Sequence, residues 1–343
     1  MIRQIFVLLH DKRNIYHIMN EALSRIRKPI EDDLARYRDL FLQSLSHDNP
    51  LLDYALKHLA KRTGKMMRPI LGILAARAFG QADDKVLHAM VSLELLHTAS
   101  LVHDDVLDQS DQRRGQQSVN ALMNNTQAVL VGDYLLSRAL EHAALTGDVR
   151  VVHAVARLGN LLADGELLQI YNTSLTEVEE ESYYKVIERK TASLFSTVAY
   201  VGSLLAGAPS EHIDKLHNFG RILGLCFQIR DDIFDYNPTA DLGKPSGIDM
   251  KEGKLTLPII AAVMKPGNDA ERALALKVRA GEATDQDVAF LTQFAIQQGG
   301  VDYAYQAMER LSQQALSELD FLPETPVKDS LIEYLNFVAQ RDL

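Results

Sequence analysis

The chain has 343 residues, 47% of them hydrophobic, which is enough for one large folded domain or two ordinary ones. Its net charge of −10 argues against a nucleic-acid-binding protein, because such proteins carry a basic face. An anionic substrate is still compatible with this charge, since bound metal ions invert the local sign. The single cysteine, Cys226, excludes a disulfide within the chain and favours a reducing, cytoplasmic location.

The N-terminal segment, residues 1–18, is expected to be a loosely attached extension, and residues 19–343 are expected to form one helical domain. The apolar run at 5–9 is too short for a membrane span or for the core of a signal peptide. Met19 is an alternative start, because the amphipathic pattern begins soon after it.

Apolar residues at helical spacing predict helices along most of the chain. No run of alternating β-branched residues is long enough to predict a strand, so the expected fold class is all-α. A capping box of Thr176 and Glu179 is expected to begin the helix that leads to Lys190. The other expected helices cover residues 30–45, 51–62, 84–108, 119–145, 149–172, 256–264, 269–279, 285–298, 301–320 and 327–340, with two more after Pro69 and after Pro209.

Three carboxylates stand in an apolar stretch at Asp104, Asp105 and Asp108, and two arginines, Arg113 and Arg114, follow them. On a helix, Asp104 and Asp108 share one face because they are four residues apart. Carboxylates this close repel one another unless a cation lies between them, and Mg²⁺ prefers oxygen ligands. Guanidinium groups bind phosphate bidentately. The stretch therefore predicts a magnesium–diphosphate site.

The same pattern recurs at Asp231, Asp232 and Asp235. Either copy alone is weak evidence, because acidic pairs usually lie on solvated helix faces. Both copies have apolar neighbours, however, so their helices are expected to be buried on nearly all sides. Six carboxylates in a core would be very costly without cations or basic partners. The repeat therefore favours a metal site over a purely structural role.

Two further stretches carry basic residues. Lys65 and Arg68 are three residues apart at the expected start of a helix, where both could bind one anion. Taken alone, this pair is better explained as two solvated basic residues at the entrance of a helix. The polar, glycine-rich segment 241–257 is expected to be a mobile loop with three lysines.

The order of these motifs resembles that of the trans-type polyprenyl diphosphate synthases. The resemblance covers about residues 28–343 and implies an all-α bundle of the isoprenoid synthase type, with a central cavity between helices. It also implies a homodimer, for which the apolar faces of residues 119–145 are the expected interface. The motifs that carry the resemblance are Gly64–Pro69, Asp104–Gly115, Lys190–Thr191, Gln228–Asp235 and the loop from Gly243 to Lys254.

The resemblance implies two or three Mg²⁺ ions between the aspartate motifs, held by Asp104, Asp108, Asp231 and Asp235. Asp105 and Asp232 would be further ligands or partners of the ligands. The implied contacts of the allylic diphosphate are Arg113, Lys190, Thr191, Gln228, Lys244 and Lys254. Isopentenyl diphosphate would bind without metal, and its implied contacts are Lys65, Arg68, His97 and Arg114.

The implied reaction is ionisation, condensation and elimination. Metal and basic groups stabilise the charge on the departing diphosphate. The double bond of isopentenyl diphosphate then attacks the allylic cation, and a proton passes to the released diphosphate. His103 could act as a base, but its place next to the aspartates favours a role in packing or as a partner of the metal ligands.

Product length is expected to depend on Ala99 and Ser100, just before the first aspartate motif. One helical turn rises about 5.4 Å, close to the length of an isoprene unit, so a bulky ring here would block a growing tail. In the family, small residues at these positions accompany longer products. We therefore expect an octaprenyl or nonaprenyl product of the kind that supplies quinone side chains, with transient membrane association for its release.

Other interpretations are open. One is a synthase of shorter products, farnesyl or geranylgeranyl diphosphate. Another is a regulatory subunit of a heteromeric prenyl synthase, although such subunits usually lack some of the motif residues. A terpene cyclase would be expected to carry a different second metal motif. A metal-dependent phosphohydrolase built on His103 would need further histidine ligands.

Overall fold

The computed structural model describes residues 12–61, 64–113, 115–236 and 247–339. Almost all the elements in this part of the chain are helices, and the only strands in it are two residues long, so the predicted all-α class is confirmed. The chain divides by its internal contacts into two compact units. The single domain expected for residues 19–343 stays a prediction, and the extension expected at 1–18 is described only from Lys12, where α2 begins.

The first unit comprises the described residues within 1–160, 194–220 and 319–334. Its elements are α2 (Lys12–Arg27), η1 (Lys28–Ile30), α3 (Glu31–Ser44), α4 (Pro50–Ala60), α5 (Met67–Arg77), α6 (Asp84–Leu107), β1 (Gln112–Arg113), β2 (Gln116–Gln117), α7 (Val119–Leu122), α8 (Asn125–Leu145), the first half of α9 (Val149–Asn172), α11 (Ser193–Leu205), the start of α12 (Ser210–Phe234) and the start of α18 (Pro326–Ala339).

The second unit comprises the described residues within 161–193, 221–318 and 335–343. Besides the remainders of α9, α12 and α18, it contains α10 (Glu180–Ile187), the π-helical turn η2 (Glu188–Ala192), α13 (Ile248–Lys251), α14 (Leu257–Val263), α15 (Asp269–Arg279), α16 (Asp285–Gln297) and α17 (Gly300–Ser317).

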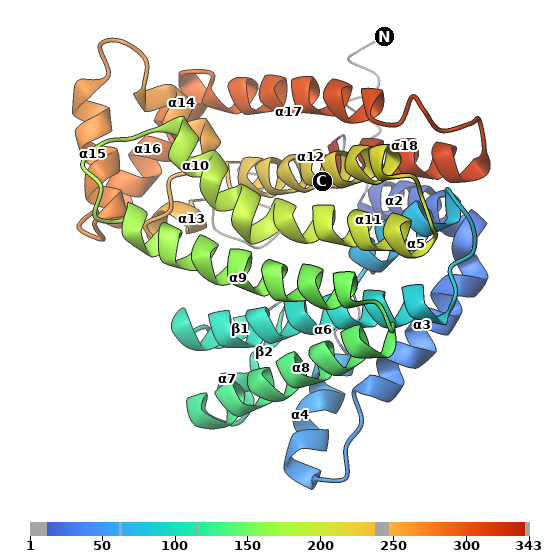
Figure 1. The fold of residues 1–343 in the computed structure, drawn as a ribbon. Helices are drawn as coiled ribbons and strands as arrows, with labels where there is room; N and C mark the ends of the chain where they lie inside the picture. Colours follow the sequence, from blue (N-terminus) through green and yellow to red (C-terminus); the bar gives the residue numbers. More distant parts are fainter. Residues whose placement is uncertain (1–11, 62–63, 114, 237–246, 340–343) are drawn as a thin grey trace. The chain divides into compact units, whose positions relative to one another are not determined.

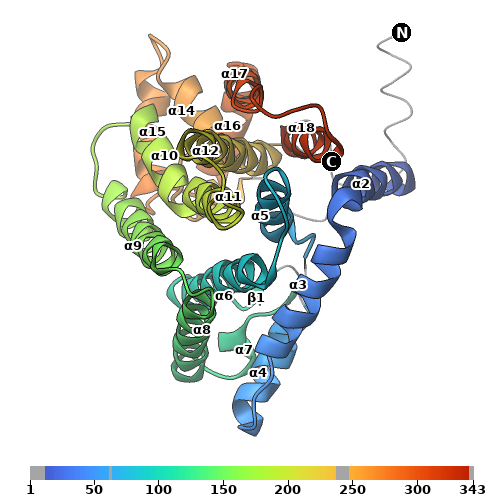
Figure 2. The same cartoon turned by 45° about the vertical axis from the view of Figure 1, so that its right-hand side comes forward.

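Helix α6, which carries the first aspartate motif, packs along α8 in the first unit (Figures 1 and 2). The helices approach closely at Gly132, where a Cβ would lie 2.1 Å from the His103 ring. By length and composition alone, α6 could cross a membrane, yet most of its apolar stretch is buried inside the protein, as in the core helix of a globular protein. The burial agrees with the apolar surroundings noted for this motif.

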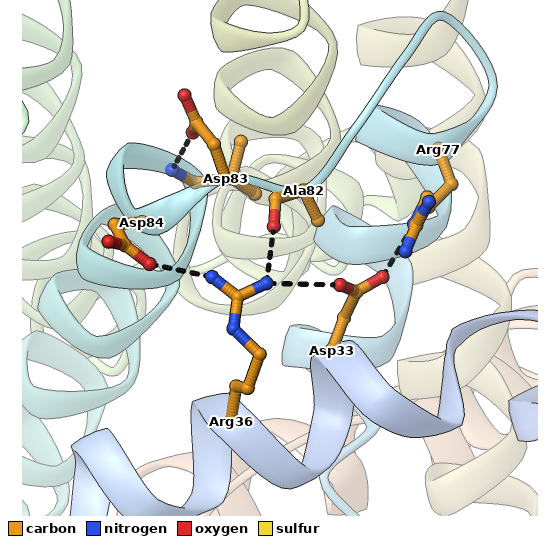
Figure 3. A network of polar contacts seen from close by, with 7 residues as sticks. Asp33, Arg36, Arg77, Ala82, Asp83 and Asp84 are labelled. Carbon is orange, nitrogen blue, oxygen red and sulfur yellow. Dashed lines mark hydrogen bonds and ion pairs between the residues drawn. The ribbon is translucent and has the colours of Figure 1, made fainter.

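A network of charged side chains positions the start of α6 (Figure 3). Asp33 of α3 is buried and accepts hydrogen bonds from Arg77 Nε at 2.5 Å and from Arg36 Nη1 at 3.4 Å. Arg36 also donates to Asp84 at 2.6 Å, in the first turn of α6. The Asp83 carboxylate caps this helix. Helix α3 is thus linked to the end of α5 and to the beginning of α6.

Two predictions about helices are wrong. The helix expected over 119–145 is interrupted, because Asn124 adopts an extended backbone and its side chain caps α8 by accepting the Gln127 N–H at 2.8 Å. The expected capping box at Thr176 and Glu179 is not formed. Helix α10 begins only at Glu180, and Glu179 has no side-chain capping bond.

Candidate active site

The first aspartate motif lies at the C-terminal end of α6, in the first unit. Asp104 is half-buried, Asp105 is buried and Asp108 is exposed. The Asp108 N–H donates to the Asp104 carbonyl at 2.8 Å, so the helical spacing continues to the last aspartate. Gln109 then takes a left-handed backbone (φ 51°), which ends the helix. The outer carboxylates of the motif therefore share one face, as the spacing predicted.

Arg113 comes from a small hairpin formed by β1 and β2, in which Arg113 pairs with Gln116. Gly115 occupies the turn with a positive φ of 73°. The hairpin places Arg113 Nε 2.6 Å from Asp105 Oδ1, and this carboxylate is buried. No strand was expected here, because two-residue strands leave no alternating pattern in the sequence. Arg114 lies outside the described residues.

Two of the residues expected to bind isopentenyl diphosphate, Lys65 and Arg68, lie at the start of α5. Arg68 donates from Nε and Nη2 to the two carboxylate oxygens of Glu94, at 2.9 and 2.8 Å. The Lys65 carbonyl accepts a hydrogen bond of 2.6 Å from Arg27 Nη2. Met66, between the two basic residues, has a left-handed backbone (φ 52°), a conformation that is uncommon outside glycine and is enriched at ligand-binding sites. The sequence did not single out Glu94.

The second aspartate motif ends α12, in the second unit. Asp231 is exposed, Asp232 is buried and Asp235 is half-buried. Asp232 Oδ2 accepts the Tyr183 hydroxyl at 2.6 Å, and Oδ1 accepts Gln228 Nε2 at 2.8 Å. Burial raises the pKa of Asp232 to about 8. Tyr183 could not be predicted as part of this site, because nothing in its sequence neighbourhood marks it.

Asp235 is held by backbone groups at the start of α13. Its Oδ1 accepts the Ile248 N–H at 2.9 Å, and its Oδ2 accepts the Asp249 N–H at 3.1 Å. The Asp249 side chain lies in the same region. Burial and the nearby Asp235 raise the pKa of Asp249 to about 6. Asp249 is thus a carboxylate of this site that the sequence did not indicate.

Lys190 and Thr191 lie in the π-helical turn η2, a rare conformation that is frequent at functional sites. Lys190 Nζ donates to Gln169 Oε1 at 3.1 Å and pairs with Glu166 of α9. Thr191 Oγ1 donates to Gln228 Oε1 at 2.7 Å, so Thr191 joins the hydrogen bonds around Asp232.

Of the two loop lysines expected to contact the allylic diphosphate, Lys254 is described and Lys244 lies outside the described residues. Lys254 Nζ donates to Glu252 at 2.6 Å. On α6, Ala99 is completely buried, whereas Ser100 is half-buried and its hydroxyl donates to the His97 carbonyl at 2.9 Å. His97 itself is half-buried, three residues after the Glu94 that binds Arg68.

The carboxylates fit a hard divalent cation that arrives with a diphosphate. Among the described residues, no three histidine, cysteine, aspartate or glutamate side chains gather closely enough to hold a metal by themselves. Mg²⁺, however, usually binds one or two carboxylates and completes its shell with substrate phosphates and water. Motifs that offer only oxygen donors match this kind of site.

The helical fold, the paired aspartate motifs and the basic residues near them define an enzyme of the isoprenoid synthase class. The family model described as Polyprenyl synthetase matches residues 49–294. Octaprenyl diphosphate synthase of Escherichia coli (strain K12) is 34% identical over 321 residues, covering 93% of this chain and 99% of the relative. The chain therefore belongs to the polyprenyl synthetase family, and it is a prenyltransferase.

Solved structures agree with this assignment. Geranylgeranyl pyrophosphate synthase from Bacteroides thetaiotaomicron is 40% identical with a TM-score of 0.82, covering 93% of this chain and 99% of that one. Polyprenyl synthase from Caulobacter crescentus CB15, complexed with calcium and isoprenyl diphosphate, is 31% identical with a TM-score of 0.85, covering 93% and 98%. The predicted family and fold class are confirmed.

Proposed function

We propose that this prenyltransferase condenses isopentenyl diphosphate with an allylic diphosphate, farnesyl diphosphate or a similar primer, to give a long-chain all-trans polyprenyl diphosphate for quinone side chains. The proposal rests on a pattern of burial that the two aspartate motifs share. In each, the second carboxylate is buried against protein donors, while the outer two are more accessible. Accessible oxygens near helix ends suit a metal–diphosphate complex.

We infer that Mg²⁺ ions, two or three of them, bind to Asp104, Asp108, Asp231 and Asp235. The calcium in the Caulobacter relative supports a divalent ion, since both metals prefer oxygen ligands. When bound, the metal supplies charge neutralisation for the departing diphosphate. The chain itself adds positive charge from Arg113, which Asp105 orients, and from Lys190, which Glu166 and Gln169 orient.

Isopentenyl diphosphate is proposed to bind without metal, to the side chains of Lys65, Arg68, His97 and Arg114. The two hydrogen bonds from Arg68 to Glu94 fix the plane of the guanidinium, which lowers the entropy lost when a diphosphate binds to it. The remaining proposed contacts of the allylic diphosphate are Thr191, Gln228, Lys244 and Lys254.

The long chain is supported by the octaprenyl relative and by the small side chains of Ala99 and Ser100. A shorter, geranylgeranyl product is the second candidate, favoured by the 40% identity to the Bacteroides enzyme. A cytoplasmic location, transient membrane association for product release and a homodimer belong to the same proposal. Helix α8 has exposed apolar side chains at Leu130, Leu140 and Leu145, which support the dimer. Monomeric proteins seldom leave so many large apolar side chains exposed on one helix.

The experiment is product chromatography. The purified chain is incubated with Mg²⁺, farnesyl diphosphate and excess isopentenyl diphosphate, and the dephosphorylated products are separated on a reversed-phase column. We expect octaprenyl or nonaprenyl alcohol as the end product. A geranylgeranyl product would refute the long chain but retain the reaction, whereas no elongation by the isolated chain would favour a regulatory subunit.

A further inference from the structure

The second aspartate of each motif differs from its neighbours in exposure. Asp105 is 1% exposed and Asp232 is 4% exposed, whereas Asp108 and Asp231 are exposed. A desolvated carboxylate is costly unless donors surround it. The structure supplies these donors in both units, from Arg113 to Asp105 and from Tyr183 and Gln228 to Asp232. In both motifs, therefore, the second carboxylate is a buried anchor, a group held in place by hydrogen bonds from protein donors.

Around Asp232 the donors form a connected chain. Tyr183 from α10 binds one carboxylate oxygen, and Gln228, one turn earlier on α12, binds the other. Gln228 in turn accepts the hydroxyl of Thr191 from η2. Tyr183 is itself buried, so its hydroxyl approaches Asp232 from within the protein. Four side chains therefore connect α10, η2 and the end of α12.

We propose that Tyr183 is a positioning residue for prenyl transfer: with Gln228 it fixes Asp232 as a buried anchor rather than a metal ligand. This inference rests on the proposed function. Helix ends fray, and α12 ends at Phe234, only two residues after Asp232. Anchoring Asp232 therefore holds the last turn of α12 and, with it, the adjacent Asp231 and Asp235. The same hydrogen bonds hold Thr191, a proposed contact of the allylic diphosphate.

The test replaces Tyr183 by phenylalanine, which keeps the ring and removes the donor. The matched control is Tyr184→Phe on the same helix; the Tyr184 ring contacts that of Tyr183 edge-on, with centroids 5.4 Å apart. Loss of a group that orients metal ligands typically costs about 10- to 100-fold in metal affinity or activity. We expect Tyr183→Phe to raise the Mg²⁺ concentration for half-maximal activity and to lower kcat by about tenfold or more. The KM for isopentenyl diphosphate should stay unchanged.

Binding gives a readout that does not depend on turnover. Calorimetric titration with Mg²⁺ and a farnesyl thiolodiphosphate, which resists ionisation, should show weaker binding for Tyr183→Phe and wild-type binding for Tyr184→Phe. Thermal unfolding of both variants checks that they fold. Wild-type Mg²⁺ dependence and wild-type analogue binding in a folded Tyr183→Phe protein would overturn the inference.

A double-mutant cycle tests whether Tyr183 acts through Asp232. If it does, adding Tyr183→Phe to Asp232→Ala costs little further, because the acceptor of the Tyr183 hydroxyl is already absent. Independent, additive losses would contradict the inference. Failure of the proposed function is distinguishable, since in that case the wild-type chain would not elongate a primer at all.

Discussion

Arg113 Nε donates a 2.6 Å hydrogen bond to Asp105 Oδ1 across the end of α6, and the acceptor is a buried carboxylate. The pair joins the hairpin to the first aspartate motif. Removing the arginine would leave a buried charge without this donor. Breaking such a contact is far more costly than breaking an exposed ion pair.

We therefore predict that Arg113→Ala lowers the free energy of unfolding by about 1–3 kcal/mol, in addition to weakening allylic diphosphate binding. Urea denaturation at pH 7 measures the first effect. Arg150→Ala is the control, because Arg150 is largely exposed in its pair with Asp148 and should change stability by less than about 1 kcal/mol. Equal losses in the two variants would contradict the buried-anchor role of Asp105.

A second prediction concerns the close packing of α6 and α8. A Cβ at position 132 would meet the His103 ring, so Gly132→Ala should destabilise the protein by about 1–3 kcal/mol. Gly159→Ala is the control, since its Cβ would meet only Leu96 at 3.9 Å and alanine favours a helix. Adding His103→Ala should recover part of the stability lost by Gly132→Ala. If it recovers none, the His103 ring is not the obstacle.

A third prediction concerns the pH dependence of stability. Burial and the neighbouring His88 lower the pKa of His142 to about 4, and the two Nδ1 atoms lie 2.9 Å apart. The folded-state pKa is below the unfolded value of about 6.5, so protonation favours unfolding. The contribution of neutral His142 to the free energy of unfolding is fully present above pH 6.5 and is lost as the pH falls toward 4.

Through this histidine, the free energy of unfolding should be about 1–2 kcal/mol lower at pH 5 than at pH 7. Urea denaturation of the wild type and of His142→Leu at both pH values measures the difference, which the variant should reduce. His153→Leu, which replaces an exposed histidine on α9, should keep the wild-type pH dependence. An unchanged pH dependence in His142→Leu would refute the assignment.

A fourth prediction concerns product length. Ser100→Phe should shorten the product, because the ring would block a tail that grows along this face of α6. Ser100→Ala removes the hydrogen bond to the His97 carbonyl without adding bulk, and it should leave the product length unchanged. Ala99→Tyr should shorten the product too, but Ala99 is fully buried, so this variant should also lose about 1–3 kcal/mol of stability. Wild-type products from Ser100→Phe would refute the proposed path.

The sequence predicted those features that depend on local periodicity. The bounds of α6 and α9, and the shared face of Asp104 and Asp108, follow from helical spacing and were predicted closely. The break at Asn124 was missed because one capping residue outweighed an apolar pattern that runs through it. The expected capping box failed because Glu179 precedes the helix instead of lying inside it.

The partners of the motifs could not be predicted in this way. Tyr183 meets Asp232 from 49 residues away, and Glu94 meets Arg68 from 26 residues away. Such pairs depend on how helices pack, which spacing within one helix does not specify. The π-helical turn at Lys190 likewise has no pattern of its own in the sequence. The motifs therefore predicted the metal–diphosphate chemistry, and the structure identified the side chains that hold the motif residues in place.

Metal-dependent prenyl transfer by both aspartate motifs is the centre of the proposed function. Its most direct test is incorporation of labelled isopentenyl diphosphate into farnesyl-primed products, with Mg²⁺ and after chelation by EDTA, for the wild type, Asp104→Asn and Asp231→Asn. We predict long-chain labelled products only for the wild type with Mg²⁺, and losses of at least about 100-fold in each variant. Incorporation that persists without metal, or in either variant at the wild-type rate, would contradict the claim.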